Sequence, residues 1–196
     1  MDMIDNPKLV HELIEVCQSY DIPAMQRMVE AGCDVVVFGD DYADKNSTLM
    51  SPRHFKEFIL PGLKRAVDAA HEAGAYVLKH TDGNIMGIID MIVDTGIDAL
   101  NPIEPQAGMD IGLVKEKYGD RIAIIGNIDC GYLLSQAPAE EVRRVTRRTI
   151  QIAAPGGGYM LSSSNSIHSS VKPENFMAMV ETLREYGEYP IGNDHA

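Results

Sequence analysis

The sequence predicts an α/β fold built from about five parallel βα units, arranged as part of a (β/α)8 barrel. Two observations support this. Five short apolar runs recur along the 196 residues, and each follows a helix-like stretch that ends near glycine. Each run also ends in a cluster of polar residues. The carboxyl ends of parallel strands meet on one rim, where such folds carry their sites, so the pattern indicates an enzyme.

The polar clusters contain side chains that can do chemistry. They are Gly39-Asp40-Asp41-Tyr42, His80-Thr81-Asp82-Gly83-Asn84, Asn101-Pro102-Ile103-Glu104-Pro105, Gly126-Asn127-Ile128-Asp129-Cys130-Gly131 and Ser162-Ser163-Ser164-Asn165-Ser166-Ile167-His168. Solubility alone does not require His, Asp, Glu and Asn to recur at the same end of every strand.

The first predicted elements are two helices and a strand. Asn6-Pro7 begins a helix that extends to about Tyr20, because proline is favoured in the first helical turn. A second helix follows Pro23 and ends at Gly32. Residues 33–38 form a continuous apolar run, which is typical of a strand buried on both faces.

The remaining elements repeat this plan. Helices are expected at 51–73, 85–95, 113–118, 138–153 and from 173 to about 187, and strands at 76–79, 98–100, 122–125 and 159–161. Gly74, Gly96 and Gly119 end three of the helices. Glu140 and Glu141 lie in a first turn, where the helix dipole favours acid. Right-handed crossovers would place all five strands parallel in one sheet.

A five-stranded open α/β sheet is the alternative fold. Five units are too few to close an eight-stranded barrel. However, no Gly-rich phosphate loop follows the first strand, and Gly39-Asp40-Asp41 presents carboxylates there instead. We therefore favour a barrel segment and expect residues 1–196 to form a single domain.

Composition excludes several classes of protein. A net charge of −12 argues against nucleic-acid binding, which needs a basic surface. No apolar stretch approaches the ~20 residues that cross a bilayer, so no membrane association is expected. The three cysteines, Cys17, Cys33 and Cys130, have no paired spacing, and the acidic N-terminus does not resemble a signal peptide. We expect a cytoplasmic protein that acts on a small molecule.

His80 and Asp82 are the strongest candidates for catalysis. Residues two apart on a strand share a face, so both side chains can reach one ligand. Imidazole with carboxylate suits a divalent metal or proton transfer. Glu104 lies between two prolines that fix its direction, although a rigid turn is an equally good interpretation. Cys130 is more typical of a packed thiol than of a ligand.

Substrate contacts are expected from the other strand ends. Asn127 and Asp129 share a face, and Asn165 and His168 lie in a serine-rich loop with many hydrogen-bond donors. Asp40 and Tyr42 follow the first strand, with Asp41 between them. No P-loop, dinucleotide fingerprint, Gly-x-Ser-x-Gly elbow or paired CxxC is present, so ATP, NAD and serine-hydrolase chemistry are not expected.

Taken in order, several of these segments resemble the C-terminal part of the uroporphyrinogen decarboxylase superfamily. They are Met50-Ser51-Pro52-Arg53-His54-Phe55, His80-Thr81-Asp82-Gly83, Asn101-Pro102-Ile103-Glu104, Gly126-Asn127-Ile128-Asp129 and Pro173-Glu174-Asn175. The resemblance implies a (β/α)8 barrel whose N-terminal strands have no counterpart here. It also implies that Ser51 contacts substrate. Asn165 stands where the decarboxylases have histidine.

The superfamily also includes corrinoid-dependent methyltransferases, which bind zinc through a His-x-Cys pattern and a second Cys. Here His80 matches, Asp82 replaces the first Cys and Asn165 lies near the second. The resemblance therefore implies corrinoid-linked methyl transfer from a small methylated substrate. Zinc would be held by His80, Asp82 and Glu104, and a partner protein would supply the corrinoid.

Two other functions remain open. One is uroporphyrinogen decarboxylation, and the other is a non-catalytic barrel segment that binds a small ligand. In all three cases the missing strands would leave a free sheet edge, so a homo-oligomer such as a dimer is expected.

Overall fold

Five parallel strands form one open sheet in the computed structural model of this chain, which describes residues 1–191. The strands are β1 (Val35–Phe38), β2 (Tyr76–His80), β3 (Ala99–Asn101), β4 (Ala123–Ile128) and β5 (Tyr159–Ser163). Neighbours in the sheet follow the chain order β1-β2-β3-β4-β5, and every pairing is parallel. The predicted fold class, with five parallel βα units, is confirmed.

The strand order distinguishes the two predicted architectures. A doubly wound sheet reverses its order at a switch point, whereas consecutive units of a (β/α)8 barrel add strands in one direction. The sequential order here is that of a barrel arc. The sheet is nevertheless open, with β1 at one edge and β5 at the other.

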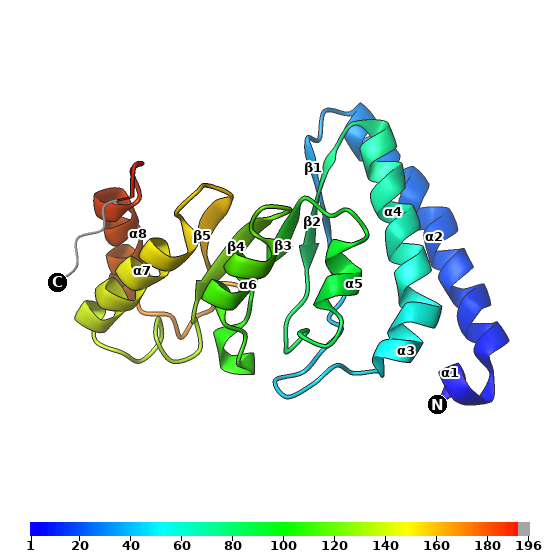
Figure 1. The fold of residues 1–196 in the computed structure, drawn as a ribbon, viewed down its shortest axis with the longest axis horizontal. Helices are drawn as coiled ribbons and strands as arrows, with labels where there is room; N and C mark the ends of the chain where they lie inside the picture. Colours follow the sequence, from blue (N-terminus) through cyan, green and yellow to red (C-terminus); the bar gives the residue numbers. More distant parts are fainter. Residues whose placement is uncertain (192–196) are drawn as a thin grey trace.

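Helices connect the strands and cover one side of the sheet (Figure 1). They are α1 (Asp2–Asp5), α2 (Pro7–Glu30), α3 (Pro52–His54), α4 (Leu60–Ala73), α5 (Ile89–Val93), α6 (Ile111–Tyr118), α7 (Ala139–Ala153) and α8 (Pro173–Tyr186). A short π-helix, Phe55–Ile59, joins α3 to α4, and a short 3-10 helix, Pro105–Ala107, precedes α6. Helices α2 and α4 pack together beside β1, and α7 packs with α8 at the other end.

Two helix predictions were wrong. The two helices expected on either side of Pro23 are one helix, α2, with Pro23 inside it. Proline removes a single hydrogen bond there, and packing of α2 on α4 offsets that loss. The helix expected at 85–95 is only α5, because Asn84 Oδ1 accepts from the Met86 amide and holds the preceding residues in turns.

The main core lies between the sheet and the helices. Val36, Val77, Leu100 and Ile124 are buried on the helix-facing side of β1 to β4. A second cluster joins Ile128 and the loop after β4 to α7 and α8. These two clusters fix the strand ends that carry the polar residues.

The other side of the sheet is only partly covered. Val35 and Val37 on β1 are 45% and 61% exposed, Tyr76 on β2 is 64% exposed, and Met160 on β5 is 51% exposed. We call these four side chains, with the half-buried Leu78, the open face of the sheet. The prediction that the first strand is buried on both faces was therefore wrong, because the side chains on its second face stay exposed to solvent.

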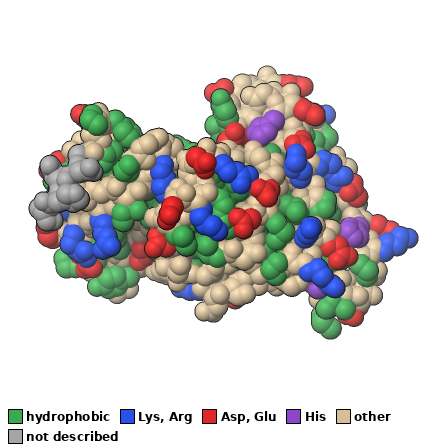
Figure 2. Space-filling model, in the orientation of Figure 1, with side chains coloured by type: hydrophobic (Ala, Val, Ile, Leu, Met, Phe, Trp, Pro, Cys, Tyr) green, Lys and Arg blue, Asp and Glu red, His purple; other side chains and the backbone are tan. Residues whose placement is uncertain are grey.

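Acidic and basic side chains are interspersed over the face of the molecule seen in Figure 2. Within residues 1–191, no helix has the length and apolar character needed to cross a membrane.

Candidate functional site

The candidate site lies at the carboxyl ends of β1 and β2. His80 is the last residue of β2 and Asp82 comes two residues later, while Asp41 comes from the segment after β1. One potential ligand atom from each of these three residues lies within 4.8 Å of the other two. The sequence predicted that His80 and Asp82 lie together but gave Asp41 no definite role.

The orientation of His80 follows from its hydrogen bonds. Its Nδ1 lies 2.7 Å from Asn101 Oδ1, and the Asn101 amide nitrogen donates to the Ile125 carbonyl at 3.3 Å. Since Asn101 thereby offers its oxygen to the ring, Nδ1 carries the hydrogen. The lone pair of His80 is on Nε2, which lies 3.8 Å from Asp82 Oδ1.

The two oxygens of Asp82 have different surroundings. Oδ2 accepts a hydrogen bond from the Asn165 amide at 2.7 Å, whereas Oδ1 is buried and has no hydrogen-bond partner within the described chain. Burial raises the pKa of Asp82, and the charges of Asp41 and Glu104 act in the same direction, against His80 and Asn165. Two acceptor atoms, Oδ1 and Nε2, thus face each other without a donor between them, which favours a cation there.

Glu104 lies beside this group without joining it. Its Oε2 accepts a hydrogen bond from the Gly83 amide at 2.7 Å and holds the turn after Asp82. The structure therefore offers Asp41 as a third ligand in the position for which the sequence suggested Glu104.

Lys79 is a residue of the site that the sequence analysis missed. It is fully buried on the helix-facing side of β2, next to His80. Its ammonium donates to the carbonyls of Asp40 and His80 at 2.9 and 2.8 Å and lies 4.1 Å from the centre of the Tyr42 ring. Burial lowers the pKa of Lys79 to about 8, although Asp40 and Asp41 oppose the shift. A single lysine in a predicted strand matches no motif, so the sequence did not indicate a role for Lys79.

Several predicted substrate contacts have structural partners instead. Tyr42 is buried against Phe55, and burial raises the pKa of its phenol. Asn127 is buried and donates to the Ile103 carbonyl at 2.9 Å. Ser51 caps α3 through the His54 amide at 3.2 Å. The side chains of these three residues are thus engaged in contacts within the protein.

Asp40, Asn165 and His168 are exposed at the rim. Asp40 has a backbone φ of 76°, and its carbonyl is one of the acceptors of Lys79. Asn165 reaches across the rim to Asp82 from the loop after β5. The His168 ring accepts from the Ser170 amide at 3.3 Å. Of the three, only Asn165 contacts the Asp41, His80 and Asp82 group directly.

Asp129 holds the loop after β4. Its carboxylate accepts from the amides of Gly131 (2.9 Å), Tyr132 (2.8 Å) and Leu133 (3.0 Å) and from the Gln106 side chain (2.7 Å). Burial alone would raise the pKa of Asp129, but these hydrogen bonds outweigh it and hold the pKa below its ordinary value. The carboxylate is thus stabilised in its charged form.

Asp129→Ala is expected to lower the free energy of unfolding by about 1 to 2 kcal/mol, allowing for partial solvent exposure of the carboxylate. Because the folded-state pKa is depressed, this contribution is complete above the ordinary pKa of about 4 and disappears as pH falls below it. Urea denaturation at pH 7 and pH 3 measures both effects. Asp120→Ala, at an exposed acid, is the control. Equal losses in the two variants at pH 7 would contradict this role.

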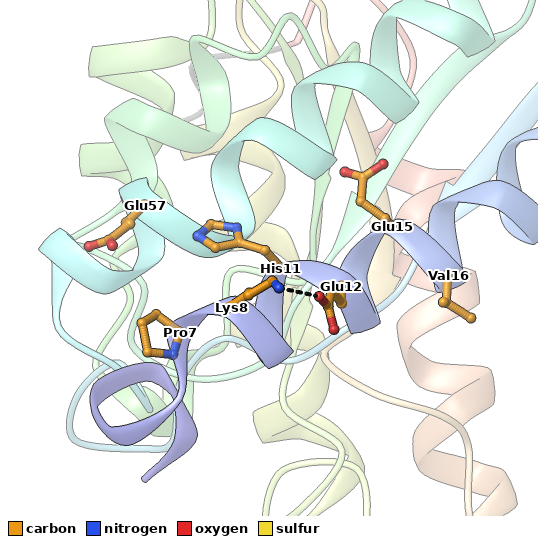
Figure 3. A pocket seen from close by; sticks show the side chains of 7 residues that line it. All are labelled: Pro7, Lys8, His11, Glu12, Glu15, Val16 and Glu57. Carbon is orange, nitrogen blue, oxygen red and sulfur yellow. Dashed lines mark ion pairs between the residues drawn. The ribbon is translucent and has the colours of Figure 1, made fainter.

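Two hollows lie near α2. A groove of about 510 Å³ runs between α2, β1 and α4, is lined mainly by apolar side chains, and reaches Asp40 and Tyr42. A second, open hollow lies along the N-terminal part of α2 (Figure 3). Its charged residues include Lys8 and Glu12, which pair at 3.6 Å, and its His11 ring packs on Phe58. Only the first hollow reaches the candidate site.

Comparison with known proteins agrees with the geometry. A family model described as Uroporphyrinogen decarboxylase (URO-D) matches residues 1–186. The uroporphyrinogen decarboxylase of Thioalkalivibrio sulfidiphilus is 28% identical over 193 residues, covering 94% of this chain and 51% of the relative. The methylcobamide:CoM methyltransferase MtaA of Methanosarcina barkeri is 26% identical over 183 residues, covering 93% and 51%. The chain spans about half the length of these curated relatives.

A solved structure shows the same fold. A methyltransferase from Methanosarcina mazei superposes with a TM-score of 0.80 at 24% sequence identity, over 95% of this chain and 52% of the other. At this identity the likeness concerns the fold alone. It places the five-stranded arc within about half of a larger chain.

Proposed function

This chain belongs to the uroporphyrinogen decarboxylase family, and we propose that its rim binds a divalent cation for corrinoid-linked methyl transfer from a small methylated substrate. The observation that carries the proposal is the buried, unpartnered Asp82 Oδ1 facing His80 Nε2, with Asp41 beside them. Relatives of two enzymatic kinds match the chain, and the ligand chemistry favours one of them.

The donor set favours an oxygen-bearing substrate. Two carboxylates and one imidazole form a harder site than thiolates, and hard sites prefer oxygen ligands. Cys130 is buried against Ser164 and is not in the ligand group. When bound, a divalent cation would act as a Lewis acid on the oxygen of the methyl donor.

Methyl transfer also needs an acceptor, for which we propose a reduced corrinoid carried by a partner protein. The methyl–oxygen bond breaks with its electron pair on oxygen, and the corrinoid supplies the pair for the new bond to carbon. A proton then completes the leaving group, which is an alcohol when the donor is a methyl ether and water when the donor is methanol. The contribution of this chain is to orient the donor. Asn101 and Asn165 hold the His80 ring and the Asp82 carboxylate in fixed directions.

Decarboxylation of uroporphyrinogen is the second candidate, since decarboxylases are among the relatives. Asp41, Asp82 and Glu104 give this part of the rim a negative charge, which would repel the carboxylates of that substrate. Turnover of uroporphyrinogen by the purified chain would favour decarboxylation over methyl transfer. Ligand binding without any turnover would instead identify a non-catalytic protein.

Cation binding is tested by titrating metal-free protein with Co²⁺ and recording its visible absorption and binding heat. One ion per chain is expected. His80→Ala and Asp82→Ala should weaken binding by at least about 100-fold, because each removes a ligand. His71→Ala is the matched control, because His71 pairs with Asp98 and is outside the ligand group. Wild-type protein that binds no Co²⁺ would refute the site.

A second pair of variants separates the two candidates for the third ligand. Asp41→Asn is expected to weaken Co²⁺ binding more than Glu104→Gln, because Glu104 is outside the group. Methyl transfer is then assayed with reduced cobalamin and a panel of methanol and methyl ethers. The activity should require His80, and turnover that His80→Ala leaves unchanged contradicts the proposal.

We further propose that this single domain is an arc of a barrel and that a second copy covers its open face. The apolar open face and the free edges of β1 and β5 favour association. Two copies together have about the length of one curated relative. The three free cysteines favour a reducing compartment, the cytoplasm. A fluorescent fusion found outside the cytoplasm would contradict that location.

A further inference from the structure

Lys79 stands out because a fully buried ammonium requires compensation. Moving an unpaired charge out of water costs several kcal/mol, so a buried lysine is ordinarily paired with a carboxylate. Lys79 has 0% exposure, and no carboxylate in residues 1–191 lies within ion-pair distance of its Nζ. Its partners are backbone carbonyls and an aromatic ring.

The carbonyls come from the ends of two strands. Nζ donates to the carbonyls of Gly39, of Asp40 at 2.9 Å and of His80 at 2.8 Å, with the Phe38 carbonyl at 3.5 Å. The Tyr42 ring adds a cation–π contact at 4.1 Å. The ammonium therefore ties the end of β1 to the end of β2.

The backbone alone does not stabilise the turn that Lys79 binds. Asp40 has a φ of 76°, in the left-handed region that a non-glycine residue rarely adopts. The carbonyls of Gly39 and Asp40 also lie past the last ladder pairing of β1, Phe38 with Lys79. The lysine thus satisfies acceptors that the sheet does not.

The same turn places Asp41 beside Asp82 and His80. Its Oδ1 accepts from the Asp82 amide at 2.9 Å, and the next amide, that of Tyr42, donates to Thr81 Oγ1 at 3.0 Å. We propose that Lys79 is a positioning residue: by binding the carbonyls of the Gly39–Asp41 turn, it holds the Asp41 carboxylate against Asp82 and His80. The effect on cation binding rests on the proposed function, whereas the effect on the turn does not.

The test compares Lys79→Met with the wild type by hydrogen–deuterium exchange of the metal-free protein. The variant keeps the length of the side chain and removes the ammonium. Exchange of the Tyr42 and Asp82 amides is expected to rise about tenfold, with no change in β4 and β5. Lys79→Arg, which keeps the charge, should recover part of the protection. Lys115→Met is the matched control, because Lys115 also donates to a backbone carbonyl, that of Gly157, away from the site.

Unchanged exchange at Tyr42 and Asp82 overturns the inference, and so does an increase spread equally over the whole sheet. If Lys79→Met does not fold, the inference is tested by ¹⁵N-lysine NMR of the wild type, which measures how fast the Lys79 ammonium exchanges its hydrogens. A slowly exchanging Lys79 ammonium supports its hydrogen bonds to the strand-end carbonyls, and one that exchanges as fast as exposed lysines refutes them.

Cobalt titration provides the second readout. Lys79→Met is expected to weaken Co²⁺ binding about tenfold, as is usual for residues that orient a ligand, and Lys115→Met should leave it unchanged. If wild-type protein binds no Co²⁺, the proposed function fails while the exchange result still decides the role of Lys79. Normal Co²⁺ affinity in a folded Lys79→Met variant would show that Asp41 is held without the lysine.

Discussion

Gly126→Ala is expected to prevent the chain from folding stably. Gly126 lies in β4 with a φ of 144°, and an added Cβ would lie 2.0 Å from the Pro102 carbonyl oxygen. That oxygen belongs to the backbone of the loop after β3, which the Asn127 side chain binds through the Ile103 carbonyl. Neither segment can move away without breaking the contact between β4 and the loop that carries Glu104.

We expect a loss of more than about 4 kcal/mol in the free energy of unfolding, in the range of the most severe single substitutions. Gly96→Ala is the matched control. Gly96 also has a positive φ, 90°, but its added Cβ would meet no atom within 4 Å. Its backbone strain should cost about 1 to 2 kcal/mol. Urea denaturation measures both, and losses that differ by less than 1 kcal/mol would contradict the close approach of Pro102.

Substitutions on the open face are expected to abolish self-association. The double variant Val37→Glu, Met160→Glu places charge on β1 and β5, at the two edges of the sheet. Wild-type protein should elute with the mass of two chains, because association buries the apolar face and pairs the free edges. The variant should have the mass of one chain, since charge would be buried at the contact.

Light scattering after size-exclusion chromatography measures these masses. Leu113→Glu is the control: Leu113 is 43% exposed on α6, close to the exposure of Val35, and lies away from the sheet. It should leave the dimer intact. A wild-type monomer at micromolar concentration would falsify the proposal that a second copy covers the face.

The order of helices and strands could be predicted from the sequence, because apolar runs and the glycines that end helices are local signals. It also placed His80 and Asp82 together, since alternation along a strand is local too. The C-terminal ends of β2 to β5 were placed too early: His80, Asn101 and Ser163 are within strands, because parallel pairing continues into polar residues. Continuation of α2 past Pro23 depended on packing against α4, which no local pattern encodes.

The site residues that the sequence missed are those whose roles depend on tertiary contacts. Lys79 carries no distinguishing motif, and its carbonyl partners at the end of β1 lie about forty positions away in the chain. Asn101 orients His80 because β2 and β3 pair in a register that places the two residues opposite each other. Asp129 looked like a substrate ligand because strand-end carboxylates often are, but its oxygens are occupied by its own loop.

The three ligand residues have a further consequence for how substrate choice could change. Asp41, His80 and Asp82 all come from the ends of two adjacent strands, and α3, α4 and their loops connect those strands. Within residues 1–191, the later units contact this part of the rim through Asn101 at the end of β3, Glu104 in the loop after β3 and Asn165 in the loop after β5. The rest of the rim can therefore diverge in sequence, and accept different molecules, while the chemistry stays in one neighbouring pair of units.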